Sequence, residues 1–383
     1  MIGREGRALS VAEKLAWLRL GRTENVGPIT FFQLLQHYGS AEAALAALPE
    51  LAVRGGRRRR LKVMGRAAAE AELEAHERLG ARLIAWTEPE YPDALAEIPD
   101  PPPVISALGN AHLLQRRAVA VVGARNASAN GRMLARQIAA ELGGDGFCIV
   151  SGLARGIDAA AHAAATDTGT VAVFAGGIDV VYPKENQALF EKILAQGAVI
   201  AENRPGTEPL ARHFPRRNRL ISGLSLGVCV VEAAARSGSL ITARLALEQG
   251  REVFAVPGSP LDPRCRGTNN LIRNGAVLCE SAADIVEALA GQIRTPAAEP
   301  AAPGFVTAAL ETPSDEALAL ARRSIAEALS PTPVSVDELI RACETTPSVA
   351  WTVLLELELA GRLERHPGSR VSLLMAAPDA ADA

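Results

Sequence analysis

The chain has 383 residues, a formal net charge of −3, 48% hydrophobic residues and 22% charged residues, as expected for a soluble globular protein of two or three domains. It contains no apolar run of about 18 residues, and its N-terminal segment mixes arginine with glutamate, so we expect neither a membrane span nor a signal peptide. The five cysteines are odd in number and form no CxxC pair. This pattern argues against a zinc site or a disulfide framework and favours a cytoplasmic location.

The N-terminal part, which we place at residues 1–85, has apolar residues at helical spacing. The segment 25–28, Asn-Val-Gly-Pro, predicts a turn followed by the start of a helix. Residues 54–62, RGGRRRRLK, form a basic run that is either a solvated loop or a phosphate contact. These features predict a small helical domain.

Residues 86–292 alternate short apolar runs with helical stretches. We expect strands at 118–122, 148–150, 171–174, 227–231 and 253–256. Between them we expect helices at 131–143, 158–168, 187–196 and 239–249. Continuous apolar strands separated by helices predict a parallel sheet covered on both faces, that is, a doubly wound, Rossmann-like α/β domain.

A Pro- and Ala-rich linker is expected at 293–312, and a disordered tail at 376–383. Between them, residues 313–375 predict three helices and a hairpin, which is a winged-helix pattern. A capping box at Ser335 and Glu338 opens the second helix, and Thr346-Pro347 opens the third. The third helix carries Glu356 and Glu358 but no Lys or Arg, so we favour a protein-contact or structural role for this part over DNA reading.

The net charge divides unevenly among these parts. Residues 1–110 are neutral, residues 111–294 carry +4, and residues 295–383 carry −7. A near-neutral total therefore does not exclude a nucleic-acid partner. It places the expected basic face on the α/β domain.

Five polar segments are expected as loops at the carboxyl ends of strands, where α/β sheets bind ligands. They combine glycines that permit close backbone approach with cationic, amide and hydroxyl groups suited to phosphate. The first two contribute Gly123, Arg125, Ser151, Gly152, Arg155 and Gly156. The third contributes Tyr182, Lys184 and Asn186. For the first segment, an ordinary strand-to-helix turn remains an open interpretation.

The fourth segment, 212–219, holds four arginines around an aromatic ring, which suits a polyanion and a stacked base. It contributes His213, Phe214, Arg216, Arg217, Asn218 and Arg219. The fifth contributes Ser237, Gly238, Ser239 and Thr242, with Ser239 expected to cap a helix. A similar stretch, 267–270, is expected just before a short helix at 271–273. For both of these stretches, capping alone is the other interpretation.

No set of nucleophile, base and acid stands out, and no metal-ligand or nucleotide-loop pattern occurs. We expect Asp158 to cap a helix and His162 to be packed inside the protein. Glu202 and Glu232 lie near strand ends without a predictable partner. The sequence therefore predicts anion binding with no catalytic residue, metal or cofactor.

Several strings together resemble the DNA-processing protein A family (DprA, also called Smf). They are SGLARGIDAAAH at 151–162, GGIDVVYPKEN at 176–186, HFPRRNRLISGLS at 213–225 and RSGSLITARLALEQGREVFAVPGS at 236–259, with further matches at 91–104 and 267–276. The resemblance implies an extended Rossmann-like domain between an N-terminal helical SAM-like domain and a C-terminal winged-helix-like domain.

The resemblance also implies a function. Members of the family bind incoming single-stranded DNA during natural transformation, in competent cells, and load the RecA recombinase onto it for DNA recombination. They act as homodimers without a cofactor, and Arg125 and Lys184 match the positions that line the family's DNA pocket. Ala124 departs from the Ser or Thr that is common before this arginine.

Two other interpretations remain. Related Rossmann-like enzymes, the phosphoribohydrolases, cleave nucleoside monophosphates with a Gly-rich segment and a nearby Glu, but residues 237–239 lack that glycine density. A transcription regulator acting through the winged helix is the third interpretation, and the acidic third helix argues against it.

Overall fold

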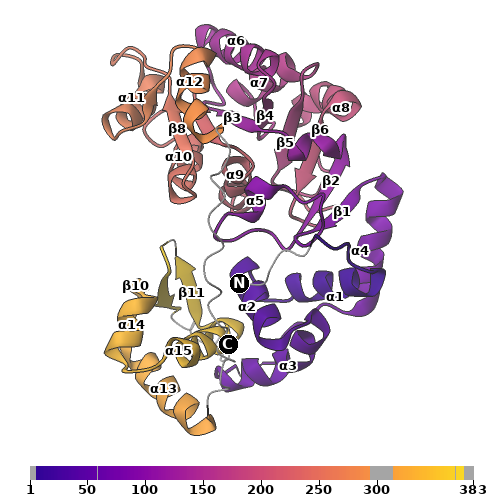
Figure 1. Cartoon of the computed structure of the whole chain (residues 1–383), viewed down its shortest axis with the longest axis vertical. Coiled ribbons are helices and arrows are strands. Elements are labelled where there is room, and N and C mark those ends of the chain that lie inside the picture. The colour runs from indigo at the N-terminus through magenta and orange to yellow at the C-terminus, as the bar shows by residue number, and fades with distance from the viewer. Residues whose placement is uncertain (1–5, 58, 294–313, 367, 375–383) are drawn as a thin grey trace, which may run out of the picture. The chain divides into compact units, whose positions relative to one another are not determined.

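A computed structural model describes residues 6–57, 59–293, 314–366 and 368–374 (Figure 1). The chain forms two compact units, one made mainly of residues 67–295 and the other of residues 15–66 with the C-terminal part. The expected linker at 293–312, apart from Ile293, and the expected tail at 376–383 lie outside the described residues. No helix within the described ranges is long and apolar enough to cross a membrane.

The larger unit is built on a mixed sheet of nine strands in the order β1-β2-β6-β5-β4-β3-β7-β8-β9. The strands from β6 to β9 in this order run parallel, and β1 and β2 are antiparallel additions at one edge. The bounds are β1 Arg82–Ala85, β2 Val104–Gly109, β3 Ala118–Val122, β4 Cys148–Ser151, β5 Thr170–Phe174, β6 Ala198–Ala201, β7 Gly227–Val230, β8 Glu252–Ala255 and β9 Val277–Leu278.

Helices cover both faces of this sheet (Figure 1). One face carries α6 (Ala129–Gly144), α7 (Ile157–Ala165), α8 (Gln187–Gln196) and α12 (Ala282–Ile293). The other carries α5 (Asp93–Ala96), α9 (His213–Gly223) and α10 (Gly238–Glu248). The unit also contains α4 (Arg66–Leu79) and α11 (Arg266–Arg273).

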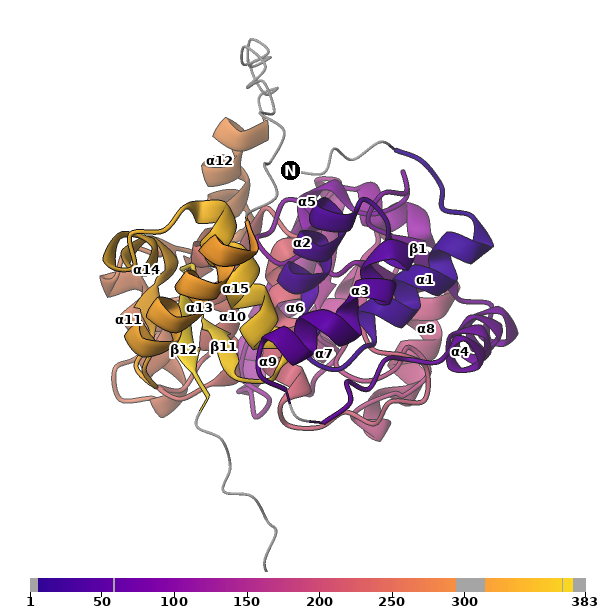
Figure 2. The same cartoon turned by 90° about the horizontal axis from the view of Figure 1, so that it is seen from below.

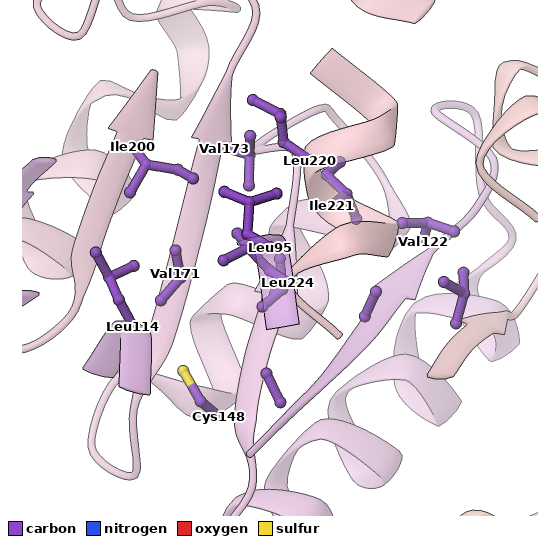
Figure 3. Packing of buried hydrophobic residues seen from close by; sticks show 14 of the residues in the cluster. Leu95, Leu114, Val122, Cys148, Val171, Val173, Ile200, Leu220, Ile221 and Leu224 are labelled. Carbon is purple, nitrogen blue, oxygen red and sulfur yellow. The ribbon is translucent and has the colours of Figure 1, made fainter. Parts of the chain in front are cut away.

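The strands form where apolar residues continue without a break. β3 reads AVAVV, and all five residues are buried. Because successive side chains alternate between faces, Val121 packs toward α6 and α7, while Val122 packs toward α9. Leu220 of α9 and Leu224, directly after this helix, point into the same cluster as Val122 (Figure 3). The sheet therefore has an apolar core on each face, as the sequence predicts.

The strand order places a topological switch point beside β3. This strand pairs with β4 on one side and with β7 on the other. After β3 the chain adds β4, β5 and β6 on one side of this strand. It then crosses back and adds β7, β8 and β9 on the other side. The carboxyl ends of β3 and β7 therefore flank the crevice in which sheets of this kind bind ligands.

The strands and helices predicted between residues 118 and 256 are present, with ends shifted by at most three residues. Two expectations are wrong. Residues 213–219 are not a loop but the first turns of α9, and residues 267–270 lie inside α11 instead of before it. In α9, Pro215 occupies the first turn, where its missing N–H costs no hydrogen bond. Strands β1, β2, β6 and β9 of this sheet were not predicted.

The smaller unit contains N-terminal helices and the winged helix. α1 (Val11–Gly21) leads into it, followed by α2 (Pro28–Tyr38) and α3 (Ala41–Arg54), and α2 starts at the predicted turn. The winged helix consists of α13 (Asp315–Ala328), α14 (Val336–Ala342) and α15 (Pro347–Leu359) with β10 (Val334–Ser335), β11 (Leu363–His366) and β12 (Arg370–Leu373) (Figure 2). Ser335 and Thr346 cap α14 and α15 as predicted.

α15, the third helix of the winged helix, has neighbours on two sides. Glu356 is buried and accepts two hydrogen bonds from Arg322 of α13, at 2.7 and 2.8 Å. On the other side, Gly55 at the end of α3 lies against the Glu356 carbonyl oxygen so closely that a Cβ would collide with it. Asn25 Nδ2 donates to the Leu359 carbonyl oxygen at 3.3 Å. This packing supports a structural role for α15.

Candidate nucleic-acid interface

Two adjoining cavities open at the carboxyl edge of the sheet. The larger has a volume of about 580 Å³ and lies at the switch point between β3 and β7. Its walls come from the segments after β3, β4 and β7 and from α9. Its polar and charged lining consists of Arg125, Asn126, Asp158, Arg217, Asn218, Arg236, Ser237, Ser239, Thr242 and Arg264.

The smaller cavity, of about 420 Å³, lies on the β4 and β5 side. Residues after these strands line it, among them Gly152, Arg155 and Tyr182. It shares Arg125, Asn126, Ala154, Phe214 and Arg217 with the larger cavity. These shared residues form a common wall, so a ligand longer than one cavity could occupy both.

An aromatic pair lies beside a cation here: Phe214 belongs to the common wall, and Tyr182 lines the smaller cavity next to it. The ring centres of Tyr182 and Phe214 are 5.6 Å apart, and their planes are inclined at 60°. Arg125 Cζ lies 5.1 Å from the centre of the Phe214 ring. Tyr182 is 49% exposed, so a ligand can reach this side chain. Nucleic-acid bases stack on such rings while a neighbouring guanidinium meets phosphate.

Positive charge is available around the cavities. Five exposed cations form no ion pair within the described part of the chain: Arg125, Lys184, Arg212, Arg216 and Arg236. Two more are paired, Arg155 with Glu185 at 2.5 Å and Arg264 with Asp262 at 2.7 Å. Surface pairs of this kind contribute about 0–1 kcal/mol, so a phosphate can compete for either arginine.

The N-terminus of α10 opens into the larger cavity. Ser237, not Ser239 as the sequence suggested, is its cap and accepts from Ser239 N at 3.4 Å. The backbone amides of the first turn and the helix dipole favour a negatively charged group there. Asp158 is likewise not a cap, because Gly156 precedes α7. Its carboxylate instead accepts from the amides of Gly152 and Ala154 inside the protein.

The acidic residues near the strand ends are engaged. The two carboxylate oxygens of Glu232 accept from Ser128 N at 2.9 Å and Ser128 Oγ at 2.5 Å, and Glu232 is buried. Glu202 accepts from Arg219 at 2.5 Å. Both carboxylates are therefore held by protein groups. Within the described ranges, no group of three His, Cys, Asp or Glu residues could hold a metal ion.

Burial sets the protonation of two residues near the site. It lowers the pKa of His162 to about 3, so this imidazole is neutral, and its Nδ1 lies 2.7 Å from Thr170 Oγ1. The expectation of a packed histidine is confirmed. Burial also lowers the pKa of Arg217, to about 10, which still leaves the guanidinium protonated at neutral pH.

Comparison with known families accounts for most of the chain. Residues 82–290 match the DNA recombination-mediator protein A family, residues 11–75 match the DprA-like N-terminal HHH domain, and residues 309–369 match the DprA winged helix domain. The chain belongs to the DNA recombination-mediator protein A family.

Relatives in this family align over long stretches. Protein Smf of Synechocystis is 33% identical, over 94% of this chain and 98% of its own length. The DNA processing protein DprA of Bacillus subtilis is 46% identical, over 57% of this chain and 74% of its own length. The resemblance that the sequence strings indicate is therefore confirmed.

Two solved DprA structures are similar to this fold. The Streptococcus pneumoniae protein superposes with a TM-score of 0.61 at 36% identity, covering 73% of this chain and 98% of that one. The Helicobacter pylori protein, whose structure describes a single-stranded DNA binding mode, superposes with a TM-score of 0.51 at 28% identity, covering 55% of this chain and 96% of that one. The predicted three-part fold of this family is confirmed.

Most of the predicted site residues line one of the two cavities. These are Gly123, Arg125, Gly152, Arg155, Tyr182, Phe214, Arg217, Asn218, Ser237, Gly238, Ser239 and Thr242. The others do not line either cavity: Ser151, Gly156, Lys184, Asn186, His213, Arg216 and Arg219.

Five of the seven residues outside the lining fall into two groups. Lys184 and Arg216 are exposed and follow lining residues in the chain, so a longer strand of DNA could reach them. Ser151, Asn186 and Arg219 instead donate to protein groups. Ser151 Oγ donates to the Val121 carbonyl oxygen, Asn186 Nδ2 to that of Leu153, and Arg219 to the Asp100 carbonyl oxygen and to Glu202.

Sequence reasoning missed three lining residues with side chains suited to nucleic acid. Asn126 and Arg236 lie within the first and fifth predicted segments and could have been included on position alone. Arg264 lies on the 3-10 helix Pro263–Cys265, which follows β8 after a long loop. No local pattern marks this arginine, because only the folding of that loop brings it to the cavity.

Proposed function

We propose that this chain is a non-enzymatic mediator of DNA recombination that binds single-stranded DNA across the two adjoining cavities. It protects incoming DNA and loads the RecA recombinase onto it during natural transformation, acting as a homodimer in the cytoplasm. The observation that carries the proposal is the open Tyr182–Phe214 pair beside the unpaired guanidinium of Arg125.

Single strands fit this wall better than duplexes do. In a duplex the bases are stacked on one another, whereas in a single strand each base can turn toward an aromatic ring. The exposed arginines and the α10 N-terminus supply phosphate contacts on either side. The binding mode described for the Helicobacter pylori relative supports the same class of ligand. The five free cysteines support a reducing compartment.

A nucleotide-cleaving enzyme of the phosphoribohydrolase type is the alternative. Such chemistry needs a carboxylate that reaches the ligand. Glu232, the acidic residue at the end of β7, has both oxygens bonded to Ser128. This engagement supports the non-enzymatic function.

The test is a binding series on the whole protein. We expect tighter binding to oligo-dT than to a duplex of the same length, and a loss of affinity as salt rises, because phosphate contacts release counterions. Arg125→Ala is expected to weaken binding about tenfold, since a hydrogen bond to a charged group contributes about 1.5–3 kcal/mol. It is also expected to lower the salt slope by about 0.7. Lys184→Ala is expected to have a smaller effect in the same direction.

Arg244→Ala is the matched control, because Arg244 is an exposed arginine of α10 outside both cavities, paired with Glu248 at 3.6 Å. Unchanged affinity in both the Arg125 and Lys184 variants would overturn the site. Release of free base from a panel of nucleotides would support the alternative function, a nucleotide-cleaving enzyme. RecA loading and dimerisation are tested by RecA filament growth on the bound strand and by the mass of the free protein in solution.

A further inference from the structure

Arg217 is a charged residue of the common wall that the fold buries. It lies on α9, three residues after Phe214, and is 6% exposed. Its Nη1 donates to two backbone carbonyl oxygens, of Gly152 at 2.7 Å and of Val173 at 2.6 Å. These two residues come from the ends of neighbouring strands, β4 and β5. One guanidinium therefore ties α9 to two strand ends.

The segment after β4 is held from a second side by Asp158. Its Oδ2 accepts from the amides of Gly152 at 3.2 Å and Ala154 at 3.3 Å. Gly152 thus has its carbonyl bound to Arg217 and its amide bound to Asp158. A Cβ at Gly152 would collide with Arg217 Nη1, so any other residue there would push the guanidinium out of its place.

The segment after β4, residues 152–157, contacts the backbone that carries Arg125. Ile157 N donates to the Ala124 carbonyl oxygen at 3.3 Å. Gly156 adopts a φ of +78° and packs against the Ala124 and Arg125 carbonyl groups with no room for a Cβ. The position of the Arg125 backbone therefore depends on the segment that Arg217 and Asp158 hold.

Asp158 and Arg217 are both charged groups buried in the protein. Burial raises the pKa of Asp158 and lowers that of Arg217, so for each group the loss of hydration opposes the charged form. Their hydrogen bonds to residues 152–154 and to the end of β5 are consistent with a positioning role. Arg217 also borders both cavities, and its guanidinium carbon lies 5.8 Å from the centre of the Phe214 ring.

We propose that Arg217 is a positioning residue: through Gly152 and the segment 152–157 it fixes Arg125 against Phe214, so that the wall is formed before DNA arrives. This inference rests on the proposed single-stranded DNA function. Preorganisation of this kind raises affinity because less ordering remains to be done on binding. The other role open to Arg217, direct contact with a phosphate, predicts different results in two experiments.

The first experiment is a double-mutant cycle on oligo-dT binding with Arg125→Ala and Arg217→Met. Each single change is expected to weaken binding about tenfold. If Arg217 acts through Arg125, the double variant also loses about tenfold, because the second change has nothing left to disturb. A loss near a hundredfold in the double variant means that Arg217 contacts DNA independently, which overturns the proposal.

The second experiment is amide hydrogen exchange on the free protein, and it needs no DNA. Arg217→Met is expected to speed exchange about tenfold in peptides covering 152–157 and 123–126. Arg217→Lys, which keeps one charged donor group, is expected to restore part of the protection. Arg244→Lys, an exposed arginine outside both cavities, serves as the control. Unchanged exchange in these two segments overturns the proposal.

Further variants and outcomes keep the two proposals apart. Should Arg217→Met fail to fold, Arg217→Lys and Asp158→Asn take its place in both experiments, with the same pattern expected at smaller amplitude. If the wild-type chain does not bind oligo-dT at low salt, the proposed function fails. The exchange measurement still decides whether Arg217 holds the two segments.

Discussion

Arg125 and Phe214 meet across the common wall of the two cavities, with the guanidinium carbon 5.1 Å from the ring centre. The arginine comes from the segment after β3, and the phenylalanine from the first turn of α9. The two contacts that single-stranded nucleic acid needs, a cation for phosphate and a ring for a base, thus come from two elements that lie far apart in the sequence.

The Phe214 ring gives the first prediction. Phe214→Leu keeps an apolar side chain but removes the aromatic face, and stacking contributes about 1–3 kcal/mol per base. We expect oligo-dT affinity, measured by fluorescence anisotropy, to fall about tenfold while the salt slope stays that of the wild type, since no charge is removed. Phe214→Trp, with a larger face, is expected to bind at least as well as the wild type. A reduced salt slope in Phe214→Leu would contradict the stacking role.

The parallel part of the sheet could be predicted because its strands are continuous apolar runs bounded by turn residues. β6 was missed because its apolar run, AVIA, follows α8 with only Gly197 between them. α9 was missed because its first half reads as a charged surface loop. Arg217 and Arg219 are in fact buried, and only their tertiary partners, the Gly152 and Asp100 carbonyl oxygens, explain why.

The sequence predicts the edge of the sheet at which the site lies better than it predicts which residues line the site. Glycine, serine and arginine after successive strands predict an anion site at one edge, since parallel strands end at the same edge. Which arginines face the cavity depends on neighbours far along the chain. Arg125 faces it, Arg219 bonds to Glu202, and Arg264 reaches it from a distant loop. Tertiary packing determines which arginines face the cavity, and no local sequence pattern indicates them.

His162 gives a prediction for stability against pH. The folded chain favours the neutral imidazole, with a pKa near 3, whereas in the unfolded chain the group takes up a proton near its ordinary pKa of 6.5. The contribution of His162 to the free energy of unfolding is therefore complete above pH 6.5. It falls as the pH drops toward 3, by about 1.4 kcal/mol per pH unit. In urea titrations, His162→Gln is expected to lose less stability than the wild type over this range.

The control for this experiment is His112→Gln, because His112 is exposed. It is expected to follow the pH dependence of the wild type. The same pH dependence in His162→Gln and in the wild type would show that the unfolding of the chain is not linked to His162. Other groups titrate in this range as well, so the comparison is made between variants and not on the wild type alone.

Gly55 gives the last prediction, in the smaller unit. Its φ of −70° is helical, so alanine fits the backbone, and helix propensity alone would make Gly55→Ala stabilising by up to about 1 kcal/mol. The new Cβ, however, would collide with the Glu356 carbonyl oxygen of α15. We expect a destabilisation of about 1–3 kcal/mol, typical of overpacking, with faster amide exchange in 356–362. Gly65→Ala, with open space around it, is the matched control. A stabilised Gly55→Ala variant would mean that α3 and α15 do not make this contact in solution.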